Sequence, residues 1–148
     1  MSEQIEQQNN KATEAPVSAA NESAAAFLVV NEGFSTREAI EEAKRCLHCK
    51  VPQCRKGCPI ENDIPEFVHE LSMGNMGAAM SIINEKSNLP AICGRVCPQE
   101  SQCEGKCIRG IKGEPVSIGK LERFVADYAL ENDIKPEGAE TMNGHKVA

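Results

Sequence analysis

Eight cysteines in two compact groups of four are the feature that most limits what this chain can fold into. The first group reads C-x2-C-x4-C-x3-C-P and the second reads C-x3-C-P-x4-C-x3-C. The members are Cys46, Cys49, Cys54 and Cys58, followed by Cys93, Cys97, Cys103 and Cys107. Two groups of four soft thiolates are suited to hold two iron–sulfur centres. The pattern therefore predicts an electron carrier.

The rest of the composition suggests that such a fold would depend on its metal. The 148 residues include four Phe, one Tyr and no Trp, which is a thin aromatic supply for a core. Small cores of this kind usually depend on a metal, on disulfides or on a partner. Residues 1–26 are rich in Gln, Asn, Glu, Ser and Ala without apolar periodicity, which predicts a disordered tail. The folded domain is expected to span residues 27–130.

Charge and hydropathy disfavour several classes of function. The net charge is −6 and no basic run occurs, so nucleic acid is not expected as a partner. The apolar stretch from Ala24 to Val30 is too short to span a bilayer, and no signal-peptide pattern is visible. We therefore expect no membrane association and a cytoplasmic location, where reduced thiols more often bind metal than form disulfides.

Helical periodicity dominates the segments outside the cysteine groups. Ser35 and Glu38 have the spacing of a capping box, which marks the start of a helix. The predicted helices span residues 36–45, the segment from Asp63 to Gly74, residues 75–86, and residues 118–130 after a cap at Ser117. Residues 46–58 and 110–115 are predicted as loop and turn, and Leu89-Pro90 as a break. The fold class is therefore mostly α, with two cysteine-bearing loop regions and no convincing strand.

The spacing also predicts that the two groups do not map one to one onto two clusters. In bacterial ferredoxins the last cysteine of the run, before Pro, binds the other cluster. Applied here, that logic sends the last cysteine of each group across. The predicted ligands are Cys46, Cys49, Cys54 and Cys107 for cluster one, and Cys58, Cys97 and Cys103 for cluster two.

Cluster two lacks one ligand, and the residues offer two candidates for it. Cys93 is the remaining cysteine. Glu122 lies within the apolar stripe of Ile118, Leu121 and Val125, where a carboxylate is costly unless it is paired or binds a metal. A position at the edge of the stripe, or pairing with a nearby Lys or Arg, is the more common explanation of such a glutamate. The residues alone leave the choice open.

Taken together, these motifs resemble the N-terminal iron–sulfur domain of the glutamate synthase small subunit family. Dihydropyrimidine dehydrogenase and the large subunit of NADH-dependent ferredoxin:NADP oxidoreductase share that domain. The resemblance covers roughly residues 28–130 and is carried by EEAKRCLHC (41–49), GCPI (57–60), LPAICGRVCP (89–98), CEG (103–105) and IGKLERF (118–124). It implies an α-helical ferredoxin fold with two [4Fe–4S] clusters. Family members use Gln or Glu at the position of Glu122, so the resemblance favours Glu122, with Cys93 as the alternative.

The resemblance also implies a function. The domain would relay single electrons between a flavin and NAD(P)H region and a partner subunit of a multi-subunit, glutamate synthase-like oxidoreductase. FAD and NAD(P)H would bind a C-terminal part, because this chain contains no G-x-G-x-x-G motif. Residues 131–148 are expected to be a linker and the start of that part. No catalytic residue is expected in the present chain.

A zinc-binding interaction module with two four-cysteine sites is the alternative interpretation. The C-x2-C pair supports it, whereas the longer spacings and the C-P steps are less typical of zinc ribbons. A disulfide-stapled secreted domain is a weaker alternative, because no signal peptide is visible.

Overall fold

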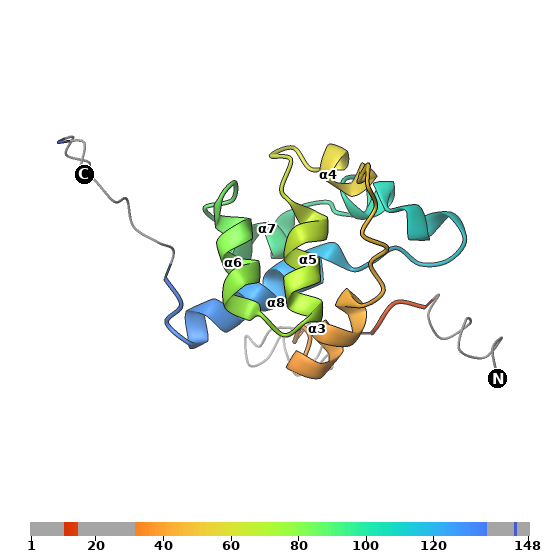
Figure 1. Ribbon diagram of the computed structural model, residues 1–148. Helices are drawn as coiled ribbons and strands as arrows, with labels where there is room; N and C mark the ends of the chain where they lie inside the picture. The colour runs from red at the N-terminus through yellow and green to blue at the C-terminus, as the bar shows by residue number, and fades with distance from the viewer. Residues whose placement is uncertain (1–10, 15–31, 136–143, 145–148) are drawn as a thin grey trace, which may run out of the picture.

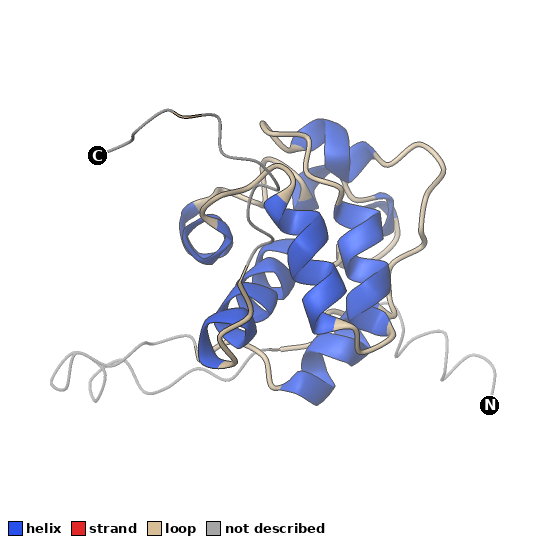
Figure 2. Cartoon of the chain, turned by 60° about the vertical axis from the view of Figure 1, so that its left-hand side comes forward, coloured by secondary structure: helices blue, strands red, loops and turns tan. Residues whose placement is uncertain are grey.

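The computed structural model describes residues 11–14, 32–135 and 144, and its regular structure is entirely helical (Figure 1). In chain order the elements are α3 (Thr36–Ala43), α4 (Gln53–Gly57), α5 (Ile64–Ser72), α6 (Met76–Asn84), α7 (Pro90–Val96), the 3-10 turns η1 (Glu104–Lys106) and η2 (Ile108–Ile111), and α8 (Ile118–Glu131). Figure 2 shows these helices joined by loops, with no strand in the described residues. The predicted mostly α fold class is confirmed.

The predicted tail and linker fall largely outside the described residues. The segments that are not described are 1–10, 15–31, 136–143 and 145–148. Of the predicted tail, only residues 11–14 are described, and the backbone N–H of Thr13 donates to Glu42 Oε2 at 2.8 Å. Across the described part of the chain, no helix combines the length and the apolar character needed to cross a bilayer.

Helix α3 begins at the predicted capping box. The Ser35 side chain accepts a hydrogen bond from the Glu38 backbone N–H, and the Ser35 N–H donates to Glu38 Oε2 at 2.8 Å. Two orphan donors of the first turn are thereby satisfied. The helix ends at Ala43, and a turn at Lys44 and Arg45 leads into the first cysteine.

The core lies between α5, α6 and α8, which crosses behind the other two in Figure 1. Its fully buried side chains include Phe67 and Leu71 from α5, Ile83 from α6, and Leu121 and Val125 from α8. Burying one such side chain contributes about 1.5–3 kcal/mol. The predicted apolar stripes of these helices therefore face the core.

The cysteine regions contain more helix than the sequence predicted. The expected loop over residues 46–58 includes the one-turn helix α4, and the expected break at Leu89-Pro90 is instead the start of α7. Proline has its φ fixed near the helical value and needs no N–H donor in the first turn, so it can begin a helix. As a result, Cys54 and Cys93 lie inside short helices, while the other cysteines lie in loops or at helix ends.

Two glycines allow helices to approach closely. A Cβ added at Gly94 in α7 would lie 2.7 Å from the backbone nitrogen of Arg123 in α8. A Cβ added at Gly57 in α4 would lie 2.6 Å from the carbonyl oxygen of Gln102, just before η1. The α7–α8 contact is the most extensive between helices, and α4 packs on η1. Both contacts bring the two cysteine groups, and the helix that carries Glu122, into one unit.

Candidate metal centres

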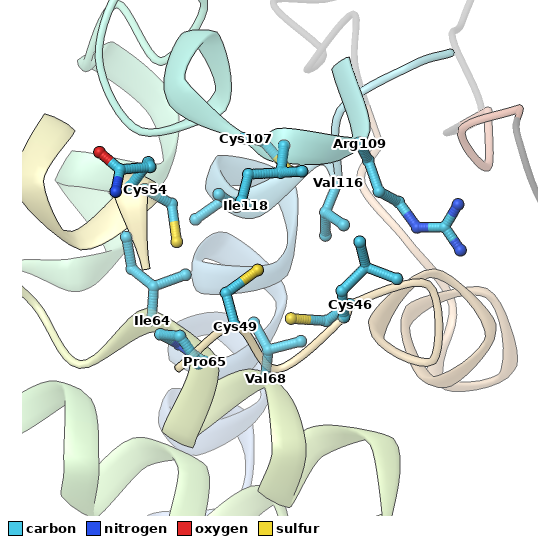
Figure 3. Close-up of a pocket in the computed structure, with 13 residues that line it drawn as sticks. Cys46, Cys49, Cys54, Ile64, Pro65, Val68, Cys107, Arg109, Val116 and Ile118 are labelled. Carbon is cyan, nitrogen blue, oxygen red and sulfur yellow. The ribbon is translucent and has the colours of Figure 1, made fainter. Parts of the chain in front are cut away.

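Four cysteines drawn from both groups line a single pocket. Cys46, Cys49 and Cys54 come from the first group and Cys107 comes from the second. In Figure 3, the sulfurs of Cys46, Cys49 and Cys54 point toward the same space. This set is the one predicted for cluster one, including the cysteine that crosses over. Cluster binding at this pocket stays a prediction.

The surroundings of this pocket are largely apolar. Apolar side chains from α5, α8 and the segment before α8 contribute to the lining, namely Ile64, Pro65, Val68, Val116 and Ile118. Four thiols in an apolar pocket form a donor set that suits an iron–sulfur cluster. As they stand, no three Cys, His, Asp or Glu side chains of the described residues are arranged to hold a single metal ion.

Burial acts on the pKa of two of these thiols, Cys46 and Cys54. It raises the pKa of Cys54 to about 11, and it also raises the pKa of Cys46. The backbone N–H of His48, which donates to the Cys46 sulfur, and the charge of Arg109 oppose the rise at Cys46. Burial thus favours the neutral thiol at Cys46 and Cys54. Because metals bind thiolates, loading a metal here must release protons.

A second set of donors gathers around Cys97, which follows α7, and Cys103, which precedes η1. Burial is the main cause that raises the pKa of Cys97. The charge of Cys93 and its hydrogen bond to Cys97 come next, and the charges of Glu122 and Cys58 follow. Burial likewise raises the pKa of Cys103 to about 12, and the charges of Glu104, Cys58 and Glu122 add to the effect. Cys58 of the first group thus lies among the donors of the second.

Glu122 and Cys93 both remain near this second set. Burial raises the pKa of Glu122 to about 7, and among the described residues no hydrogen bond or ion pair reaches its carboxylate. Cys93 has the Ser87 hydroxyl 3.9 Å from its sulfur, and its carbonyl accepts from Gln99 Nε2 at 3.0 Å. The pairing with Lys or Arg that would explain Glu122 without a metal is not found in the described part of the chain.

Glu42 is a buried carboxylate that the sequence analysis did not single out. It is 0% exposed, and its carboxylate accepts hydrogen bonds from Arg45 Nη1 at 2.6 Å, from the Ser117 N–H at 2.9 Å and from the Thr13 N–H at 2.8 Å. Its signal in the sequence was the same as that of Glu122, because it lies on the apolar face of α3 beside Ala39 and Ala43. The buried Glu42 carboxylate is therefore satisfied by protein donors, while the partly exposed Glu122 carboxylate receives none from the described residues.

A helical domain that gathers cysteines from two separate groups into shared sites is a metal-binding domain of the ferredoxin type. The chain belongs to the family described as dihydropyrimidine dehydrogenase domain II, 4Fe-4S cluster, whose family model matches residues 23–134. The resemblance inferred from the motifs is thereby confirmed.

Curated relatives agree with this membership. The chain is 37% identical over 123 residues to the small chain of NADPH glutamate synthase from Escherichia coli, an alignment that covers 82% of this chain and 26% of the relative. The corresponding protein of Halomonas elongata is 36% identical over 123 residues, with the same two coverages. The PreT subunit of NAD-dependent dihydropyrimidine dehydrogenase from Escherichia coli is 37% identical over 117 residues, covering 78% and 28%. The chain thus spans about a quarter of the length of these relatives.

Proposed function

We propose that this domain carries two [4Fe–4S] clusters and relays single electrons within a larger oxidoreductase. The observation that carries the proposal is the apolar pocket lined by cysteines from both groups. The relatives are named as subunits of NADPH- and NAD-dependent enzymes. On that basis the electrons would pass between a flavin and NAD(P)H part of a longer, cytoplasmic parent and a partner subunit of a glutamate synthase-like complex.

The proposed ligands follow the division predicted from spacing. Cluster one takes Cys46, Cys49, Cys54 and Cys107, and cluster two takes Cys58, Cys97, Cys103 and Glu122, with Cys93 as the alternative to Glu122. The contrast between Glu42 and Glu122, two carboxylates on apolar helix faces, supports Glu122 as the ligand. Glu42 has three donors, whereas Glu122 is raised in pKa by burial and has no partner among the described residues. A carboxylate ligand is harder than a thiolate, so it would shift the reduction potential of cluster two.

The protein's own groups would shape each cluster when it is bound. Apolar side chains limit water at the pocket, and the His48 N–H donates to the Cys46 sulfur. Amide donors to sulfur and limited solvent are the levers that set cluster potentials. Leu47 and Ile108 line the same pocket and are 55% and 41% exposed, so a redox partner can approach this site over an apolar surface.

Anaerobic reconstitution tests the cofactor content. We expect a brown protein with about eight iron and eight sulfide ions per chain, which corresponds to two [4Fe–4S] clusters. Electron paramagnetic resonance of the reduced protein should resolve two centres. A colourless protein that binds two zinc ions per chain after the same treatment would establish the zinc module instead.

Paired substitutions test the eighth ligand. Glu122→Ala is expected to lose about half of the iron, because one of two clusters is left with three ligands. Cys93→Ala should keep both clusters, and Glu131→Ala, at the exposed end of α8, serves as the matched control. If Cys93→Ala loses cluster two while Glu122→Ala retains it, the ligand is Cys93.

A further inference from the structure

Arg45 connects the first cysteine of the chain to a distant segment. It directly precedes Cys46, and its side chain is 5% exposed. Its guanidinium donates to Glu42 Oε1 at 2.6 Å, to the Glu114 carbonyl at 2.7 Å and to the Pro115 carbonyl at 3.2 Å. The last two carbonyls belong to the segment that runs from the last cysteine to α8. One side chain therefore holds both α3 and that segment.

Arg109 makes the return connection. It lies two residues after Cys107, and its Nε donates to the carbonyl of Arg45. Each of the two segments thus sends an arginine to the backbone of the other. Arg109 also lines the cysteine pocket, and in Figure 3 its guanidinium points away from the sulfurs. Its contact is with the polypeptide that carries the ligands.

These contacts fix the separation between the Cys46 and Cys107 segments, which a shared cluster would require. Cys46 and Cys107 line one pocket although they come from different cysteine groups. No disulfide joins them, since all eight cysteines are free. The planar guanidinium holds a carboxylate and two carbonyls in the fixed geometry of its donor fork, whereas a lysine ammonium is a point charge on a flexible stem. The two arginines are suited to fix one segment against the other.

We propose that Arg45 and Arg109 are positioning residues for cluster one, and that in the folded domain they hold the Cys46 and Cys107 segments at the ligand spacing. This inference rests on the proposed function. Glu42 completes the network, but it also accepts from the N–H of Ser117 at the start of α8, so it affects the helix that carries Glu122. The arginines are therefore the sharper test.

The test compares iron release from the two clusters in the reconstituted chain. Under anaerobic conditions with an iron chelator, Arg109→Gln should lose cluster one about 10- to 100-fold faster than the wild type, the range typical for residues that orient metal ligands. The loss of cluster two should stay unchanged. Electron paramagnetic resonance assigns each phase to its cluster. Arg37→Gln, an exposed residue of α3 with the same change in charge, is the matched control and should release iron like the wild type.

A second variant keeps the inference testable if the first does not fold. Arg45→Lys retains the charge and loses the fork, and it should also release cluster one selectively. Unchanged release from cluster one in both variants, or equal acceleration at both clusters, overturns the inference, because a purely structural pair would weaken the whole domain. A wild-type chain that takes up no clusters overturns the proposed function instead. Cluster uptake by the wild type is therefore measured before any variant is made.

Discussion

Replacing Gly94 by alanine tests whether the close contact of α7 with α8 holds the domain together. The added Cβ would lie 2.7 Å from the backbone nitrogen of Arg123 and 2.8 Å from its Cα. Carbon atoms in contact normally lie about 3.5–4.0 Å apart. The obstacle is the backbone of another helix, which no change of rotamer can move. The two helices must therefore separate by on the order of 1 Å to accept the methyl group.

The magnitude is the balance of two opposing effects. Overpacking costs about 1–3 kcal/mol, and a clash with backbone places this site near the upper end. Alanine stabilises the helix by about 1 kcal/mol relative to glycine, because its helix propensity is higher. The net loss is about 2 kcal/mol, which corresponds to a melting temperature lower by roughly 10 °C in a domain of this size.

The assay is thermal unfolding of the anaerobic, reconstituted chain, followed by circular dichroism. Gly77→Ala is the matched control, because it is also helical, in the first turn of α6, and its added Cβ has nothing within 4 Å. It should raise stability by about 1 kcal/mol. Since α7 carries Cys93 and ends at Cys97, Gly94→Ala should also release iron from cluster two faster. If the two alanine variants melt at the same temperature, the reasoning about close packing is wrong.

Three further perturbations have clear expectations. Ser35→Ala removes the capping box and should cost about 1 kcal/mol in thermal unfolding. The Ser35 hydroxyl lowers the pKa of Glu38, so this hydrogen bond contributes stability above pH 4.5. That contribution is lost as the pH falls through the lowered pKa, and the stability difference between Ser35→Ala and the wild type should shrink over the same range. Phe67→Ala empties a fully buried position and should cost about 3–5 kcal/mol in denaturant unfolding, whereas a loss below about 1 kcal/mol would contradict the assigned core. Removing the clusters with a chelator should unfold residues 46–124 cooperatively, as hydrogen exchange would report, and an apo domain with native-like protection would disprove it.

Local patterns in the sequence were sufficient for much of the fold. The capping box at Ser35 and the apolar stripe through Phe67 and Leu71 depend on residues that are neighbours on one helix, so spacing reveals them. Pro90 was misread because a proline can end one helix or begin another, and the choice depends on whether the residues after it pack as a helix against the rest of the domain.

The site shows where sequence reasoning stops. Glu42 and Glu122 present the same pattern, a carboxylate on an apolar helix face. What separates them is the set of donors that reach each carboxylate. The Ser117 N–H comes from a segment far along the chain, and no spacing rule identifies it as a partner of Glu42. The sequence thus indicates which carboxylates lie on apolar helix faces, and only the tertiary structure shows which of them accepts hydrogen bonds from protein donors.

The contact between α4 and η1 ties the two cysteine groups into one structural unit. At Gly57 the chain of the first cysteine group touches the backbone of the second so closely that no side chain fits between them. Neither half can then serve as an independent single-cluster module, although each contains four cysteines. We expect residues 32–74 or 75–135, expressed separately, to form no stable cluster, and co-expression of the two halves to restore binding. A single half that holds one cluster would show that the domain is a tandem of separable units.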